Sequence, residues 1–276
     1  MATGSSLQSA DSIPAAESTG SDILRQVAVI LALIVTLVVN TLSTTLPING
    51  TTPGEISDSF PVLFTPAGYV FAIWSVIYLG LIAYAIFQVL PSQRANPRLR
   101  AIGWLFVLSC IANSAWIFAW HYGLFPLSLG LMLVLLGSLI AIYLRLLPSY
   151  ATASGAERWT THIPFHIYLG WITVATIANT TILLYTLGWR GQPLSEALWA
   201  TIMVVVATVV GLFFILRLRD VAYTLVLVWA LAGIYVNQSD TAMVAYTAAA
   251  MALVLVVAVV YALLQRNRLP DSQTTG

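Results

Sequence analysis

The stretch that decides the fold is Pro66–Leu90, PAGYVFAIWSVIYLGLIAYAIFQVL, in which 25 consecutive residues carry no charge. A helix needs about 20 predominantly apolar residues to cross the hydrocarbon layer of a membrane. This stretch is long enough to span, and the chain contains seven others like it, with arginine only at their ends. The sequence therefore predicts a polytopic membrane protein.

The predicted fold is all-α, because helices satisfy their own backbone hydrogen bonds in lipid. We expect a transmembrane bundle of about eight spans, the seventh being the shortest. The first is expected to be retained, because its apolar core is longer than that of a secretory signal. The spans are Val27–Leu46, Pro66–Leu90, Ala101–Trp120, Leu124–Leu147, Pro164–Leu187, Leu194–Leu216, Val221–Val236 and Thr241–Leu264.

Composition supports the same class of protein. Hydrophobic residues make up 59% of the 276 positions and charged residues 8%, whereas a soluble domain carries about 25% charged residues. The lipid bilayer is therefore the expected partner, and the net charge of +1 gives no basic field for nucleic acid. All 11 basic residues are arginine, which excludes a lysine Schiff base and a Walker-type phosphate loop.

Arginine placement predicts the orientation. With the N-terminus inside, ten of the 11 basic residues fall in inside segments and only Arg190 falls outside. The positive-inside rule favours this arrangement. We therefore expect a multi-pass protein of a bacterial plasma membrane, with both termini cytoplasmic. Residues 1–22 are expected to form a flexible polar N-terminal tail, and residues 266–276 a short cytoplasmic tail.

Three spans carry aromatic stripes with polar groups at helical spacing. They are Phe71, Trp74 and Tyr78; Asn113, Trp116 and Trp120; and Tyr168, Trp171, Ala175 and Asn179. An asparagine in hydrocarbon needs a partner, so these faces should point into the bundle. Two interpretations stay open: interhelical packing through polar groups, or a ligand pocket with aromatic walls.

The same residues carry a resemblance to a known family. Pro66-Ala-Gly-Tyr-Val-Phe71-Ala-Ile-Trp74 with Tyr78, Asn113-Ser-Ala-Trp116, and Tyr168-Leu-Gly-Trp171 with Ala175 and Asn179 resemble motifs of the TspO/MBR family, the tryptophan-rich sensory proteins and the translocator protein (peripheral benzodiazepine receptor). Ala67 stands where the family has a second proline. Ile167 stands where the family has another proline, and the spacing from Phe71 to Trp74 is one residue shorter than in the family.

The resemblance implies a five-helix membrane core over residues 23–188, followed by a three-helix extension over residues 189–265. It also implies an intramembrane pocket capped by the loop between the first two spans. Its ligand would be a small hydrophobic molecule, tetrapyrrole or sterol-like, bound for sensing or transport; haem or a porphyrin would be a ligand rather than a required cofactor. The ligand-binding residues implied are Trp74, Tyr78, Asn113, Trp116, Trp171, Ala175 and Asn179.

No catalytic constellation is visible, so we expect no enzyme, no catalytic residue and no metal site. His162 and His166 lie four residues apart and are interpreted as interfacial. His121 fits either an aromatic belt or a haem ligand. The alanines of the last span suit close helix contact, including a homodimer face. The alternative function is a permease or an accessory subunit of a membrane complex with no tetrapyrrole ligand.

Overall fold

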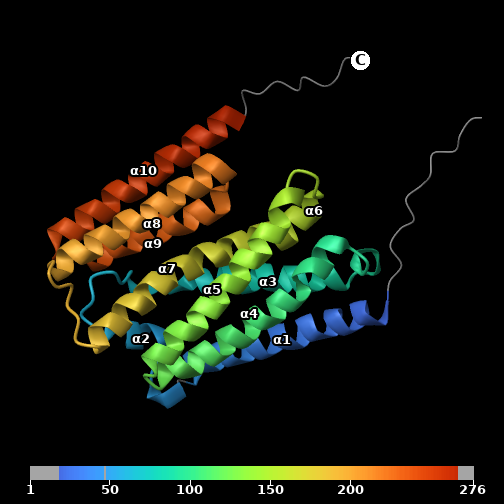
Figure 1. The fold of residues 1–276 in the computed structure, drawn as a ribbon, viewed down its shortest axis with the longest axis horizontal. Coiled ribbons are helices and arrows are strands. Elements are labelled where there is room, and N and C mark those ends of the chain that lie inside the picture. Colours follow the sequence, from blue (N-terminus) through green and yellow to red (C-terminus); the bar gives the residue numbers. More distant parts are fainter. Residues whose placement is uncertain (1–18, 47, 267–276) are drawn as a thin grey trace, which may run out of the picture.

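A computed structural model of the chain describes residues 19–46 and 48–266, and the regular elements of the described part are all helices (Figure 1). The long helices are α1 (Gly20–Thr45), α3 (Ile73–Val89), α4 (Pro97–His121), α5 (Phe125–Leu146), α7 (Ile163–Thr186), α8 (Glu196–Leu218), α9 (Val221–Asn237) and α10 (Ala242–Arg266). The short ones are η1 (Ile48–Gly50), α2 (Pro53–Asp58), η2 (Gly68–Ala72), η3 (Pro91–Gln93), η4 (Leu147–Ser149), α6 (Gly155–Glu157) and the π-helical η5 (Arg158–His162).

Each of the eight predicted spans coincides with one of the long helices. Seven helical segments among the described residues are long and apolar enough to cross a membrane, and α9 is a shorter apolar helix of 17 residues. Large apolar side chains such as Leu79, 69% exposed, cover their outer surfaces. Water would not tolerate so much exposed apolar area, so lipid must cover it. The chain is a multi-pass integral membrane protein with an all-helical bundle, as predicted.

The helices form two groups that meet along α7. α1, α3, α4, α5 and α7 pack into one group, while α8, α9 and α10 lie together on one side of it (Figure 1). The main contact between the groups is α7 against α9. Ala245 and Ala248 of α10 are buried within the chain, where α10 packs on α8 and α9. These small residues therefore serve internal packing, and a homodimer through α10 stays a prediction.

The first helix begins earlier than expected. Residues 20–22 were assigned to the flexible tail, but they form the first turn of α1, and residues 1–18 lie outside the described residues. Asp22 is buried and accepts hydrogen bonds from Nε and Nη2 of Arg100 at 2.7 and 2.6 Å. Such a two-pronged contact between guanidinium and carboxylate is strong and directional. It fixes the start of α1 to α4.

The second span also begins differently. The predicted span starts at Pro66, but regular structure starts at Gly68 as η2 and becomes α-helical at Ile73. Residues 65–70, which precede α3, are instead held by hydrogen bonds with α9 and with the residue that follows α9. The backbone N–H of Ala67 donates to the carbonyl of Gly233 at 3.1 Å. Nε1 of Trp229 donates to the Val70 carbonyl at 3.0 Å.

A second pair of contacts reaches the same segment. Nδ2 of Asn237 and Nε2 of Gln238 donate to the carbonyl of Thr65 at 3.0 and 3.4 Å. Each of these bonds pairs a backbone group of residues 65–70, a segment that precedes the α-helical part of the second span. An unpaired backbone group is costly in a membrane. The amino-acid sequence of the last three helices indicates no role for them. The structure gives α9 the role of holding residues 65–70 in place.

The close approach of α9 depends on Gly233. A Cβ atom there would lie 2.2 Å from Cγ2 of Val70, which is fully buried. We expect Gly233→Ala to lower the free energy of unfolding in mixed detergent micelles by about 1–3 kcal/mol, the usual cost of overpacking. The control is Gly137→Ala on α5, where an added Cβ meets nothing within 4 Å. A Gly233→Ala protein as stable as the Gly137→Ala protein would contradict this packing.

Candidate functional site

A cavity with aromatic walls lies between α2, η2, α3, α4 and α7. It encloses about 500 Å³ of empty space, including its open mouth. Its lining residues are Pro53, Ser57, Pro66, Phe71, Trp74, Trp116, Trp120, Trp171, Val174, Ala175, Ala178, Asn179 and Ile182. Five of the seven residues implied by the family resemblance are among them: Trp74, Trp116, Trp171, Ala175 and Asn179.

The α4 wall consists of two stacked indoles. Trp116 and Trp120 are one helical turn apart, so their side chains lie on one face. Their ring centroids are 5.5 Å apart at an angle of 23°. Nε1 of Trp120 donates to the carbonyl of Pro53 at 3.2 Å, which ties this wall to α2. The flat rings offer a broad apolar face to the cavity.

The opposite wall is built from α3, η2 and α7. Trp74 meets Trp171 edge to face at a centroid distance of 6.2 Å, and Phe71 meets Trp171 in the same way at 5.7 Å. Tyr78 does not line the cavity but stacks on Trp74 at 5.4 Å and supports it from behind. One turn after Trp171, Ala175 leaves space that a larger side chain would fill. Aromatic contacts of this kind fix ring orientation.

Two hydrogen-bond donors in this cavity have no acceptor among the described residues. They are Nε1 of Trp171 and Nδ2 of Asn179, whose residues are 3% and 2% exposed. The direction of the Asn179 amide is fixed because the indole N–H of Trp116 can only donate, and it bonds Oδ1 at 3.1 Å. Ser128 donates to the same oxygen at 2.9 Å. The amide nitrogen is therefore left over, and an unpaired buried donor costs about 1–3 kcal/mol.

Asn113 lies elsewhere. The resemblance implies that it lines the pocket, but it is not among the lining residues. Its Oδ1 accepts from Nδ2 of Asn40 at 2.7 Å, and its Nδ2 donates to the hydroxyl of Tyr168 at 3.2 Å. Asn113 thus links α1, α4 and α7 by hydrogen bonds. This arrangement fits interhelical packing, the first of the two interpretations, for this one residue. Asn40 was missed, although a lone asparagine in the first span is itself a signal for such a partner.

The loop between the first two spans covers one end of the cavity. Pro53 and Ser57 of α2 belong to the lining. The N-terminus of α2 is closed by a capping box in which Thr52 and Glu55 bond each other's backbone N–H groups at 2.7 and 3.3 Å. Hydrogen bonding from the Thr52 backbone lowers the pKa of Glu55, and burial raises the pKa of Asp58. Asn49 also donates to the His121 carbonyl at 3.0 Å.

The three histidines do not take part in this cavity. His162 and His166, interpreted as interfacial, are both buried within the protein, and Nδ1 of His166 lies 2.9 Å from Oδ2 of Asp220. His121 is buried too, with Nδ1 2.7 Å from the Ile117 carbonyl. Within the described part of the chain, no group of three or more His, Cys, Asp or Glu residues is arranged to hold a metal ion.

The position of Asn113 gives a test. Asn113→Ala removes the bonds to Asn40 and Tyr168, so we expect the free energy of unfolding in mixed micelles to fall by about 1–2 kcal/mol. Ligand affinity should change less than in variants of Trp171, which faces the cavity. The opposite pattern, with intact stability and lost binding, would place Asn113 in the site after all.

Comparison with known proteins places the chain in a family. Residues 26–261 match the family described as TSPO-like protein. The match continues past Gly188, where the resemblance was expected to end, and includes α8, α9 and most of α10. No curated protein and no solved structure gives a significant match. Because the match covers well over half of the sequence, the chain belongs to the TSPO-like protein family.

Proposed function

We propose that this protein binds a small hydrophobic ligand with a flat conjugated or fused ring system, tetrapyrrole or sterol-like, for sensing or transport. The observation that carries the proposal is the pair of unpaired donors, Trp171 Nε1 and Asn179 Nδ2, in a cavity walled by indole rings. A ligand that brings an acceptor, such as a carbonyl or carboxylate, would satisfy both. Membership of the TSPO-like family supports the same assignment.

The shape of the walls favours a planar molecule. Trp116 and Trp120 present stacked rings from α4, while Trp74 and Phe71 meet Trp171 edge to face on the other side. Offset stacking on such faces gains energy beyond simple burial. The apolar body of the ligand would lie between these walls, with its acceptor directed at α7. Haem or a porphyrin would then be the cargo rather than a prosthetic group.

We propose binding rather than catalysis. The described lining residues are aromatic, aliphatic or amide side chains, with one serine, and they include no carboxylate, imidazole or thiol. General acid–base chemistry needs a group whose pKa lies near the working pH. A receptor, sensor or carrier requires only recognition. We place the chain in a bacterial plasma membrane with both termini cytoplasmic, on the arginine asymmetry, so that α2 covers the cavity from outside.

Titration of the purified protein with protoporphyrin IX tests the site. We expect saturable quenching of tryptophan fluorescence, and roughly tenfold weaker affinity in Trp171→Phe, which keeps an aromatic ring but loses the N–H donor. Trp104→Phe is the control: it also removes one indole, but Trp104 is exposed on the outer surface of α4. Its affinity should equal that of the unaltered protein.

Equal affinity in the Trp171 and Trp104 variants would contradict the site. Absence of saturable quenching by protoporphyrin IX, together with a partner protein that co-purifies in stoichiometric amount, would favour the alternative of an accessory subunit or permease. The absorbance spectrum of the freshly purified protein gives a first indication, because a bound porphyrin produces a Soret band.

Filling the cavity provides an independent prediction. Ala175→Phe places a ring in the space between the walls, so we expect binding of protoporphyrin IX to weaken by roughly tenfold or more. Ala250→Phe, on the exposed face of α10, adds the same side chain outside the bundle and should leave affinity unchanged. Retention of full affinity by a folded Ala175→Phe protein would place the ligand elsewhere.

A further inference from the structure

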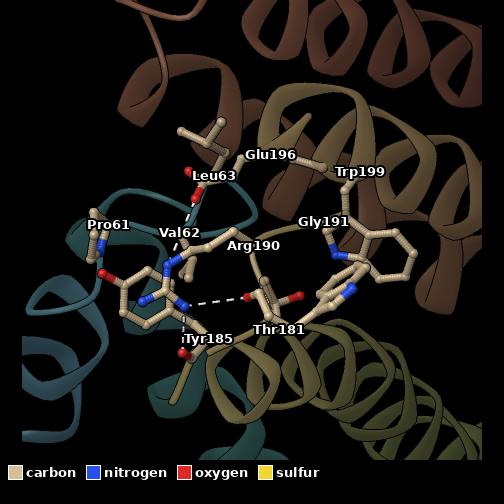
Figure 2. A pocket seen from close by; sticks show the side chains of 11 residues that line it. Pro61, Val62, Leu63, Thr181, Tyr185, Arg190, Gly191, Glu196 and Trp199 are labelled. Atoms are coloured by element: carbon tan, nitrogen blue, oxygen red, sulfur yellow. Dashed lines mark hydrogen bonds and ion pairs between the residues drawn. The ribbon is translucent and has the colours of Figure 1, made fainter. Parts of the chain in front are cut away.

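A second cavity lies where α7 ends and α8 begins (Figure 2). It encloses about 340 Å³, including its open side. Its residues come from the first interhelical loop, from α7 with the turn that follows it, and from the first turns of α8. They are Pro61, Val62, Leu63, Thr181, Tyr185, Trp189, Arg190, Gly191, Glu196, Trp199 and Ala200. It therefore exists only because the three-helix group packs against the core.

Arg190 is held rigidly at this cavity. The carbon Cζ of its guanidinium lies 3.5 Å from the centre of the Tyr185 ring. Its Nη1 donates to the carbonyls of Tyr185 and Trp189 at 2.5 and 3.3 Å. Among the described residues, none accepts a hydrogen bond from Nη2. Figure 2 shows Arg190 and Tyr185 together on one side of the cavity and Trp199 on the other. The arginine thus presents a fixed charge and an unused donor edge.

Trp199 supplies a second donor. Its Nε1 is buried and has no acceptor within the described part of the chain. The ring is fixed by an edge-to-face contact with Trp189, with centroids 4.8 Å apart. An indole N–H and a guanidinium that share one cavity suit the oxygens of a phosphate or carboxylate.

Glu196 balances the charge. Its Oε1 lies 3.9 Å from Nε of Arg190, too far for a hydrogen bond, and the two side chains are 48% and 35% exposed. The two side chains are therefore not hydrogen-bonded to each other, and both are partly exposed. Arg190 and Glu196 are the charged residues that line the cavity, so its formal charge is zero. A purely anionic ligand would meet Glu196 at close range, whereas a zwitterion would complement both charges.

The location indicates a lipid. The cavity lies at the ends of two spanning helices, where tryptophan and arginine meet the headgroup layer. Its remaining walls, including Val62, Leu63 and Ala200, are apolar. We propose that this cavity binds the headgroup of a zwitterionic phospholipid that carries a primary amine. The phosphate lies against Arg190 and Nε1 of Trp199, and the ammonium lies against Glu196.

The experiment uses the full chain, delipidated in a neutral maltoside detergent. Dihexanoylphosphatidylethanolamine is titrated while thermal stability and intrinsic fluorescence are recorded. Dihexanoylphosphatidylglycerol tests an anionic headgroup, dihexanoylglycerol tests the chains alone, and phosphoethanolamine tests the free zwitterion. We expect saturable stabilisation, strongest with the phosphatidylethanolamine.

The variants separate the two charges. Arg190→Gln and Trp199→Phe should each weaken phosphatidylethanolamine binding, Arg190→Gln by roughly tenfold. Glu196→Gln should weaken the phosphatidylethanolamine but strengthen the phosphatidylglycerol, because the repulsion is removed. Asp240→Asn, an exposed acid in the turn before α10, is the control and should change neither. If Arg190→Gln fails to fold, Glu196→Gln and Trp199→Phe still decide the matter.

Three results would overturn the proposal. Phosphatidylglycerol binding tighter than phosphatidylethanolamine in the unaltered protein would exclude the zwitterion. Phosphoethanolamine binding as tightly as the lipid would exclude a lipid as the source. If the Glu196→Gln and Asp240→Asn proteins bind both lipids with equal affinity, Glu196 does not belong to the site.

Discussion

Hydrocarbon offers no hydrogen-bond partner, and this one constraint shapes the rest of the structure. Each polar group placed inside the membrane must find a partner within the protein or pay the cost of burial. The chain meets the constraint in most places through contacts between helices, such as Asn40 with Asn113 and Trp116 with Asn179. The constraint is not met at several buried atoms, and two of them, Trp171 Nε1 and Asn179 Nδ2, belong to residues that line the same cavity.

The same constraint explains which parts of the fold were predictable. Charge-free runs of about 20 residues can hardly be anything other than spans, so the helix count and the approximate boundaries followed from the sequence alone. The first turn of α1 was not predicted, because Asp22 and Thr19 look like any polar leader until Arg100 is known to lie beside them. The irregular start of the second span was also missed, since its hydrogen-bond partners are more than 150 residues away, at Gly233 and Trp229.

The candidate site, too, could be predicted only in part from the sequence. Helical spacing indicated correctly that Trp171, Ala175 and Asn179 share a face, and all three line the cavity. Spacing could not tell a cavity face from a packing face. The family resemblance implied that Asn113 lines the pocket, although its amide joins three helices. Nor could it show the second cavity at Arg190 and Trp199, because that cavity is formed by segments brought together only in the folded chain.

The contacts of α9 with residues 65–70 tie the five-helix core to the last three helices. Pro66 and Phe71, at the edges of that segment, line the first cavity, yet the segment's backbone is satisfied by Gly233, Trp229 and Asn237. A five-helix fragment ending near Gly188 would lose the donors to the Thr65 carbonyl and the acceptor of the Ala67 N–H. The placement of residues 65–70 therefore depends on helices beyond the five-helix core. Residues 65–70 lie between α9 and the first cavity. A movement of the last three helices would therefore shift this side of the cavity.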